Sequence, residues 1–153
     1  MGPTGEVKLR WLVLLLLLGL AACTDPYRLR VGLRAEEAAN GNAPVAVAVL
    51  VVYDDSVFNE LSKLSATEWF QQAEQYQKDN PNMVSFDLLS WELMPGQEVK
   101  ESVVPLQERP AKGLVFADYY AGGRHRARFR PDRRILVLLG KQGFDVVDLE
   151  DAE

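Results

Sequence analysis

The strongest constraint on the fold is an uninterrupted apolar run in the middle of the chain, residues 45–53 (VAVAVLVVY). More than half of these residues are valines, whose β-branched side chains favour extended backbone over helix. A strand points successive side chains to opposite faces, so a run that is apolar at every position leaves no face suited to water. The sequence therefore predicts a central strand that is covered on both sides, within a layered domain.

One segment, residues 65–78, has helical periodicity. Ser65 and Glu68 form a Ser-x-x-Glu capping box, and Leu64 before it can act as a hydrophobic staple. The apolar residues that follow share one face: Trp69, Phe70, Ala73 and Tyr76. A proline at position 81 prevents the helix from continuing. We expect one amphipathic helix, packed on a sheet.

The remaining apolar segments are short and separated by turn signals. Strands are predicted at residues 27–33, 84–93, 99–106, 113–120, 124–130, 135–139 and 144–149. Turns are predicted at residues 95–96 (PG), 121–123 (AGG) and 140–143 (GKQG), and a longer polar loop at residues 34–44. This pattern predicts a mainly β protein, a two-sheet β-sandwich with one helix.

The amino terminus carries a secretion signal. Lys8 and Arg10 precede an apolar run at residues 11–22, which is too short to cross a bilayer core of about 30 Å. The run leads into LAAC at residues 20–23, the lipobox pattern of bacterial lipoproteins, and Cys23 is the only cysteine in the chain. We expect cleavage before Cys23, diacylglycerol on its sulfur, and a further acyl chain such as palmitate on its new amino group. These chains anchor the protein without crossing the membrane.

Cleavage at this point defines the domain organisation. We expect a signal peptide (residues 1–22), a lipidated spacer (23–26), a β-sandwich domain (27–149) and an acidic tail (150–153). The mature chain keeps 131 of the 153 residues, the size of one domain that can form a core without disulfides. Losing Glu6, Lys8 and Arg10 changes the formal charge from −5 to −6. That charge argues against nucleic-acid binding and against attraction to anionic lipid, so the acyl chains must do the anchoring.

The residue types needed for catalysis or metal binding are not grouped along the sequence. His125 is the only histidine, and we expect it half-exposed on a strand without an orienting partner. Zinc needs a cluster of Cys and His that the chain lacks. Adjacent acids such as Asp54-Asp55 do not face one another across a cleft, as glycoside hydrolysis requires. We predict a non-enzymatic protein with no catalytic residues, no cofactor, no metal site and no small-molecule substrate.

Two segments are candidates for binding a partner. Arginines at alternate positions are predicted to project from one face of one strand: Arg124, Arg126, Arg128 and Arg130. They form either a docking edge for an acidic partner or lipid headgroups, or a charged edge that discourages aggregation and is screened by acids of the C-terminal segment. The second candidate is the loop at residues 34–44, which is either a binding loop or a flexible connector. Its candidate contacts are Glu36, Glu37, Asn40 and Asn42.

The order of these features resembles the outer-membrane lipoprotein of type VI secretion systems, the TssJ family. The shared features are the lipobox, a first strand, an Asn/Gly loop, the apolar strand after Pro44, Phe58 with Leu61, the segment ATEWF at residues 66–70, and the turn at 95–96. A late Trp-Arg pair that many relatives carry is not found, so the chain is a divergent case. The resemblance implies a transthyretin-like β-sandwich with added helices and loops, held in the outer membrane by its lipid. It also implies that the loops, here residues 35–43, bind the periplasmic domain of the inner-membrane core-complex protein TssM.

These expectations combine into one leading hypothesis and one alternative. The leading hypothesis is a lipoprotein adaptor on the periplasmic face of the outer membrane, which tethers an envelope-spanning secretion complex by protein contacts. Thr24, directly after the lipidated cysteine, favours sorting to the outer membrane. The alternative is a pilotin or chaperone-like lipoprotein that escorts a secretin through a hydrophobic groove near Trp69, Phe70 and Trp91. In the leading hypothesis these aromatic residues belong to the core.

Overall fold

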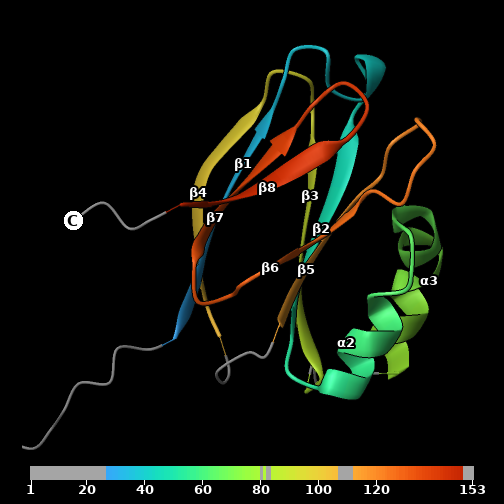
Figure 1. The fold of residues 1–153 in the computed structure, drawn as a ribbon, viewed down its shortest axis with the longest axis vertical. Helices are drawn as coiled ribbons and strands as arrows, with labels where there is room; N and C mark the ends of the chain where they lie inside the picture. The colour runs from blue at the N-terminus through green and yellow to red at the C-terminus, as the bar shows by residue number, and fades with distance from the viewer. Residues whose placement is uncertain (1–26, 80, 82–83, 107–111, 150–153) are drawn as a thin grey trace, which may run out of the picture.

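The computed structural model describes residues 27–79, 81, 84–106 and 112–149. Figure 1 shows these residues as a β-sandwich with two helices on one side. The elements follow in the order β1 (Arg28–Ala35), η1 (Ala39–Gly41), β2 (Val45–Val52), α2 (Asp55–Leu61), α3 (Ala66–Asp79), β3 (Phe86–Leu93), β4 (Glu98–Pro105), β5 (Lys112–Ala117), β6 (Arg126–Phe129), β7 (Arg134–Leu139) and β8 (Phe144–Leu149). The predicted two-sheet sandwich is confirmed.

Each sheet has four strands. One sheet has the order β4-β1-β7-β8 and the other β3-β2-β5-β6. Neighbouring strands are antiparallel except for β1 and β7, which run parallel from Val31 opposite Ile135 to Ala35 opposite Leu139. Parallel neighbours need a long connection, and here the connection from β1 to β7 includes the whole of the second sheet.

Strand β2 is covered on both faces, as its sequence predicts. One face, including Val47 and Val49, packs into the core between the two sheets. The other face, including Leu50 and Val52, packs against the helices in a second core. Each of these four side chains is fully buried. The domain therefore has three layers, two sheets and one layer of helices, with β2 in the middle sheet.

The helical layer contains one predicted helix and one that was not predicted. Helix α3 begins after the capping box, in which the Ser65 N–H donates to the Glu68 carboxylate at 2.7 Å and the Glu68 N–H donates to Ser65 Oγ at 3.3 Å. The short helix α2 was missed because its seven residues are too few to show a clear 3.6-residue period. It buries Phe58 and Leu61 against the second core.

Most predicted strands are present, but the segment at residues 113–130 differs from its prediction. Strand β5 ends at Ala117 and β6 begins only at Arg126, so the tight turn expected at residues 121–123 is an eight-residue loop, 118–125. The Ala117 N–H donates to the carbonyl of His125 at 3.1 Å and closes this loop. His125 itself has φ +43°, in the left-handed region, and is therefore not in a strand.

We predict that Trp69→Ala destabilises the domain strongly. Trp69 is fully buried and its ring is stacked on Phe116, with centroids 5.5 Å apart, so the substitution removes the centre of the second core. Truncation of a buried tryptophan costs about 3–5 kcal/mol. Urea unfolding of the mature domain measures the loss. Gln71→Ala, at an exposed position on the same helix, is the matched control and is expected to change stability by less than about 0.5 kcal/mol.

Candidate functional site

Four loops gather at one end of the sandwich, opposite the end where β1 begins (Figure 1). They are residues 36–44 between β1 and β2, 94–97 between β3 and β4, 118–125 between β5 and β6, and 140–143 between β7 and β8. Hydrogen bonds join them: the Gly96 N–H donates to the Glu36 carbonyl at 3.1 Å and the Asn40 N–H donates to the Gly140 carbonyl at 3.3 Å. We call this region the loop end.

The side chain of Asn40 joins two loops of the loop end by hydrogen bonds. Asn40 is only 5% exposed and has φ +49°, a left-handed conformation that asparagine tolerates better than most residues. Its side-chain Nδ2 donates to the Pro44 carbonyl at 2.9 Å, and its Oδ1 accepts the Tyr120 N–H at 2.8 Å. The predicted contact residue Asn40 therefore shapes the loop end from inside instead of presenting its side chain at the surface.

Tyr119 and His125 form a stacked aromatic pair within the loop at residues 118–125. Tyr119 is buried, its hydroxyl donates to the Gly140 carbonyl at 3.1 Å, and its ring is stacked on His125 with centroids 4.9 Å apart. Burial, and then the nearby negative charge of Glu36, raise the pKa of Tyr119 to about 12, so its hydroxyl stays protonated. His125 Nε2 lies 2.7 Å from the Ala121 carbonyl. The histidine is half-buried, as predicted, but it serves loop structure and not a strand.

Several polar groups of the loop end face solvent. Glu36, Glu37 and Asn42 are exposed, as their assignment to a binding loop requires. Tyr120 is 85% exposed, the highest value of any large hydrophobic side chain in the described part of the chain. An open cleft of about 250 Å³ lies beside it, lined by Asn40, Gly41, Tyr120, Ala121, Lys141 and Gln142. The arrangement offers an aromatic ring, carboxylates and a small cleft to a macromolecular surface.

The alternating arginines are not four residues of one strand. Only Arg126 and Arg128 lie in β6, while Arg124 precedes the strand and Arg130 follows it. Arg126 donates to the Leu64 carbonyl at 3.0 Å, and burial lowers its pKa, with smaller effects from its charged neighbours Arg124 and Arg128. The structure thus brings the row together only in part, because the turn preceding β6 takes Arg124 out of it.

Two further members of this row, Arg128 and Arg130, also have partners within the domain. The Arg128 guanidinium lies 5.3 Å from the centre of the Phe58 ring. Arg130 forms an ion pair with Asp132 at 2.8 Å, and this bond is the main cause that raises the pKa of Arg130. Asp148 of β8 adds a smaller effect in the same direction, in line with the expected screening by C-terminal acids. These contacts support an internal role for Arg126, Arg128 and Arg130.

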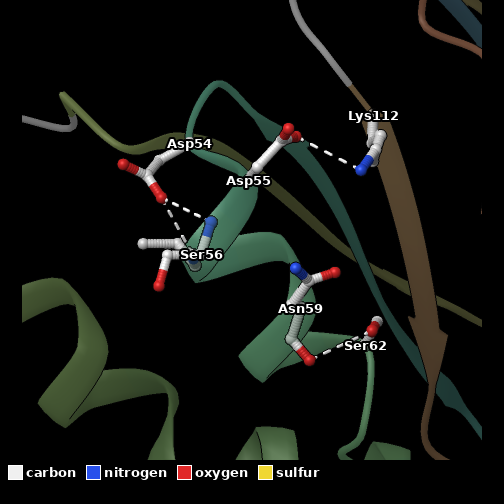
Figure 2. A network of polar contacts seen from close by, with 7 residues as sticks. Asp54, Asp55, Ser56, Asn59, Ser62 and Lys112 are labelled. Carbon is white, nitrogen blue, oxygen red and sulfur yellow. Dashed lines mark hydrogen bonds and ion pairs between the residues drawn. The ribbon is translucent and has the colours of Figure 1, made fainter.

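The adjacent acids Asp54 and Asp55 have structural roles (Figure 2). Asp54 caps helix α2, with its Oδ1 accepting the N–H groups of Ser56 at 2.7 Å and Val57 at 3.0 Å. Asp55 forms an ion pair with Lys112 at 3.2 Å. The two carboxylates point to different partners and do not face one another across a cleft. Among the described residues, no group of three or more His, Cys, Asp or Glu side chains could hold a metal ion.

The aromatic residues assigned to a possible groove lie in different places. Trp69 is fully buried in the core between the sheet and the helices. Trp91, opposite Val47 in the β2–β3 pair, packs on the other side of that sheet, against the core between the two sheets. A sheet separates the two rings, so they do not line one groove. The interpretation of Trp69 as a core residue is confirmed.

Cys23 and the rest of the signal sequence lie outside the described residues, so its lipidation stays a prediction. Within the described ranges, no helix is long and apolar enough to span a bilayer.

Solved structures give the clearest comparison, since no protein-family model and no curated protein matches the chain. The T6SS lipoprotein TssJ1 from Pseudomonas aeruginosa is similar with a TM-score of 0.59 and 21% identity over 83% of this chain and 99% of that chain. The chain has the fold of a type VI secretion lipoprotein. Serratia marcescens Lip, a membrane-bound component of the Type VI Secretion System, is similar with a TM-score of 0.59 and 20% identity, over 82% of this chain and 99% of that chain.

A third similarity comes from a structure described as the C-terminal domain of the T6SS protein TssM from EAEC. Its TM-score is 0.51, with 19% identity over 78% of this chain and 99% of that chain. At these identities the similarities establish a shared fold. They confirm the resemblance inferred from the order of sequence features.

Sequence reasoning missed Tyr120, because residues 113–120 looked like one strand ending in two tyrosines. The available signal was the segment 118–123 (DYYAGG), in which an acid and two glycines flank the tyrosines and favour a loop. Which of the two tyrosines would be buried depends on where β5 ends. The Asp118 N–H still donates to the Ala46 carbonyl of β2 at 2.8 Å, and beyond it the Tyr120 N–H donates to the Asn40 side chain at 2.8 Å and leaves the β2 ladder.

We predict that Asn40→Ala lowers the free energy of unfolding by about 2–4 kcal/mol, because it removes two hydrogen bonds made by a buried side chain, to the Tyr120 N–H and the Pro44 carbonyl, and places alanine in a left-handed conformation. Asn42→Ala is the matched control. Asn42 also has a left-handed φ, +69°, but is exposed, so its loss is expected near about 1 kcal/mol. Equal losses in urea unfolding would contradict the role given to the Asn40 side chain.

Proposed function

We propose that this chain is a lipid-anchored adaptor of a type VI secretion system. In this proposal Cys23 carries the lipid, the lipid lies in the outer membrane, and the loop end binds the periplasmic domain of a TssM-like inner-membrane protein. The proposal includes the division into signal peptide (residues 1–22), lipidated spacer (23–26), domain (27–149) and acidic tail (150–153).

The observation that carries the proposal is the position of the loop end opposite the start of β1 (Figure 1). Three residues separate Cys23 from Tyr27, the first described residue, and this chain reaches at most about 14 Å even when extended. The eight residues of β1 then span about 26 Å to the loop end. A lipid at Cys23 would hold the first end near the headgroups and leave the loop end free to meet a protein from the opposite membrane.

The comparisons support the membrane and partner parts of the proposal. Two similar structures are described as a T6SS lipoprotein and as a membrane-bound component of this system, and a third comes from a structure described as a TssM domain. Membrane anchoring confines the domain to a surface and raises its effective concentration, so modest protein contacts are sufficient. Thr24 supports sorting of the lipoprotein to the outer membrane.

A non-catalytic role is part of the proposal. The candidates that sequence reasoning weighed for chemistry, His125 and the pair Asp54 and Asp55, bind backbone groups and a lysine of their own domain. The alternative, a pilotin or chaperone-like lipoprotein that escorts a secretin, depended on a hydrophobic groove near Trp69, Phe70 and Trp91. Trp69 and Phe70 pack on one face of the sheet and Trp91 on the other, so no observation favours this alternative.

We predict that Cys23→Ser abolishes lipidation. In cells fed radiolabelled palmitate, the wild-type protein should take up label and fractionate with the outer membrane, whereas the variant should take up none, because a serine hydroxyl does not replace the thioether sulfur. Thr24→Ser keeps the cysteine and serves as the control, with labelling unchanged. Labelling of the Cys23→Ser variant would refute the lipid anchor.

We also predict direct binding between the lipidated mature protein in detergent and the purified periplasmic domain of the TssM-like protein from the same bacterium. Isothermal calorimetry measures the affinity, and a secretin C-terminal segment is the comparison. Binding to the TssM-like domain alone supports the adaptor. Binding to the secretin segment alone would support the pilotin and overturn the adaptor.

A further inference from the structure

Tyr120 is the one large aromatic side chain of the described residues that the fold leaves almost wholly in water. It is 85% exposed, whereas Trp69, Phe86 and Phe116 are fully buried. Sequence reasoning placed partner contacts on the loop at residues 34–44 and on the arginines, including Arg124 of the loop at residues 118–125, but did not consider Tyr120. We propose that Tyr120 is the anchor of the partner-binding surface, and that its ring enters an apolar recess on the partner protein bordered by basic side chains. This inference rests on the proposed adaptor function.

The backbone that carries Tyr120 is held on both sides. The Tyr120 N–H is bound by Asn40 at 2.8 Å, and the preceding Asp118 N–H is bound by the Ala46 carbonyl of β2 at 2.8 Å. The Tyr119 hydroxyl fixes the same loop to Gly140 at 3.1 Å. On the other side, His125 Nε2 lies 2.7 Å from the Ala121 carbonyl. The main chain is therefore fixed before binding, while the side chain stays available.

A fixed backbone with an exposed aromatic side chain lowers the cost of binding. Ordering a flexible loop and its side chains consumes part of the binding free energy, and a preformed loop avoids most of that cost. Tyrosine loses little side-chain entropy for the large area that it buries, and it is enriched among the residues that dominate protein interfaces. The open cleft beside Tyr120, which also includes Lys141 and Gln142, gives room for a partner side chain next to the ring.

The charge around Tyr120 indicates the chemistry of the partner. Glu36 and Glu37 are exposed on the neighbouring loop, and no ion pair joins either one to a described residue. Glu36 is close enough to Tyr119 for its charge to help raise the pKa of that tyrosine. Carboxylates that border an interface favour basic side chains opposite them and speed association at low salt. Lys141, in the cleft beside Tyr120, is one base against these two carboxylates, so the structure favours a protein surface with lysines or arginines around the recess.

The test measures the affinity of the lipidated protein for the purified periplasmic domain of the TssM-like protein, with variants at Tyr120. Tyr120→Ala is expected to weaken binding about 30-fold, the size of an interface hot spot, and Tyr120→Phe by less than about 3-fold, since the ring is kept. Val147→Ala, which truncates an exposed apolar side chain on β8, is the matched control and should bind as the wild type does. Because the Tyr120 side chain is exposed, both Tyr120 variants should unfold at the wild-type urea midpoint.

The outcomes separate this inference from the adaptor function. Wild-type affinity in Tyr120→Ala, while the wild type binds, would overturn the anchor role and leave the adaptor function in place. No binding by the wild type would overturn both.

The double variant Glu36→Gln with Glu37→Gln tests the basic border of the recess. It should bind about 5–10-fold more weakly in 50 mM salt and lose much of that difference in 500 mM salt. Tighter binding by this variant would show that the partner surface is acidic and would overturn that part of the inference.

Discussion

Burial of β2 on both faces is the interaction on which the rest of the structure depends. Because every side chain of this strand from Val47 to Val52 is buried, one layer must pack on each side of its sheet. The sheet β4-β1-β7-β8 supplies one layer, and helices α2 and α3 supply the other. Each Å² of apolar surface removed from water contributes about 25 cal/mol to the free energy of folding, so these two cores are the main source of stability. The helices meet the loop end where the Ala66 N–H of α3 donates to the Arg124 carbonyl at 2.8 Å, while Glu36, Glu37, Asn42 and Tyr120 stay exposed.

The candidate site is linked to this framework through a small number of polar contacts. Asn40 binds the backbone of its own loop and of Tyr120, and Tyr119 binds Gly140 of a third loop. The side chains of Asn40 and Tyr119 are themselves buried, so leaving either one without its partner would cost more than an average hydrogen bond adds. The loop end is therefore a formed surface and not a set of independent flexible connectors. Three of the arginines around β6, in contrast, contact groups of their own domain. Arg126 donates to a carbonyl, Arg128 lies over an aromatic ring and Arg130 pairs with a carboxylate.

The geometry relates the predicted lipid to the predicted partner. Strand β1 begins at one end of the sandwich, and the four loops of the loop end lie at the other (Figure 1). A small domain of this form suits a tether between membranes, because its length separates the two contacts and its layered core keeps them in fixed orientation. The domain shares this fold with type VI secretion lipoproteins.

Local patterns in the sequence determined much of this protein. The apolar run at residues 45–53, the capping box of Ser65 and Glu68, and the turn residues fixed β2, helix α3 and most strands, because each of these signals acts between near neighbours in the chain. The choice of residues 34–44 as a candidate binding loop also came from local composition. Only the tertiary structure decided that Asn40 is buried, that β5 ends before Tyr119, and that Tyr120 alone of the two tyrosines faces solvent. These outcomes depend on hydrogen bonds between residues as far apart as Asn40 and Tyr120, and a separation of 80 positions leaves no periodic pattern in the sequence.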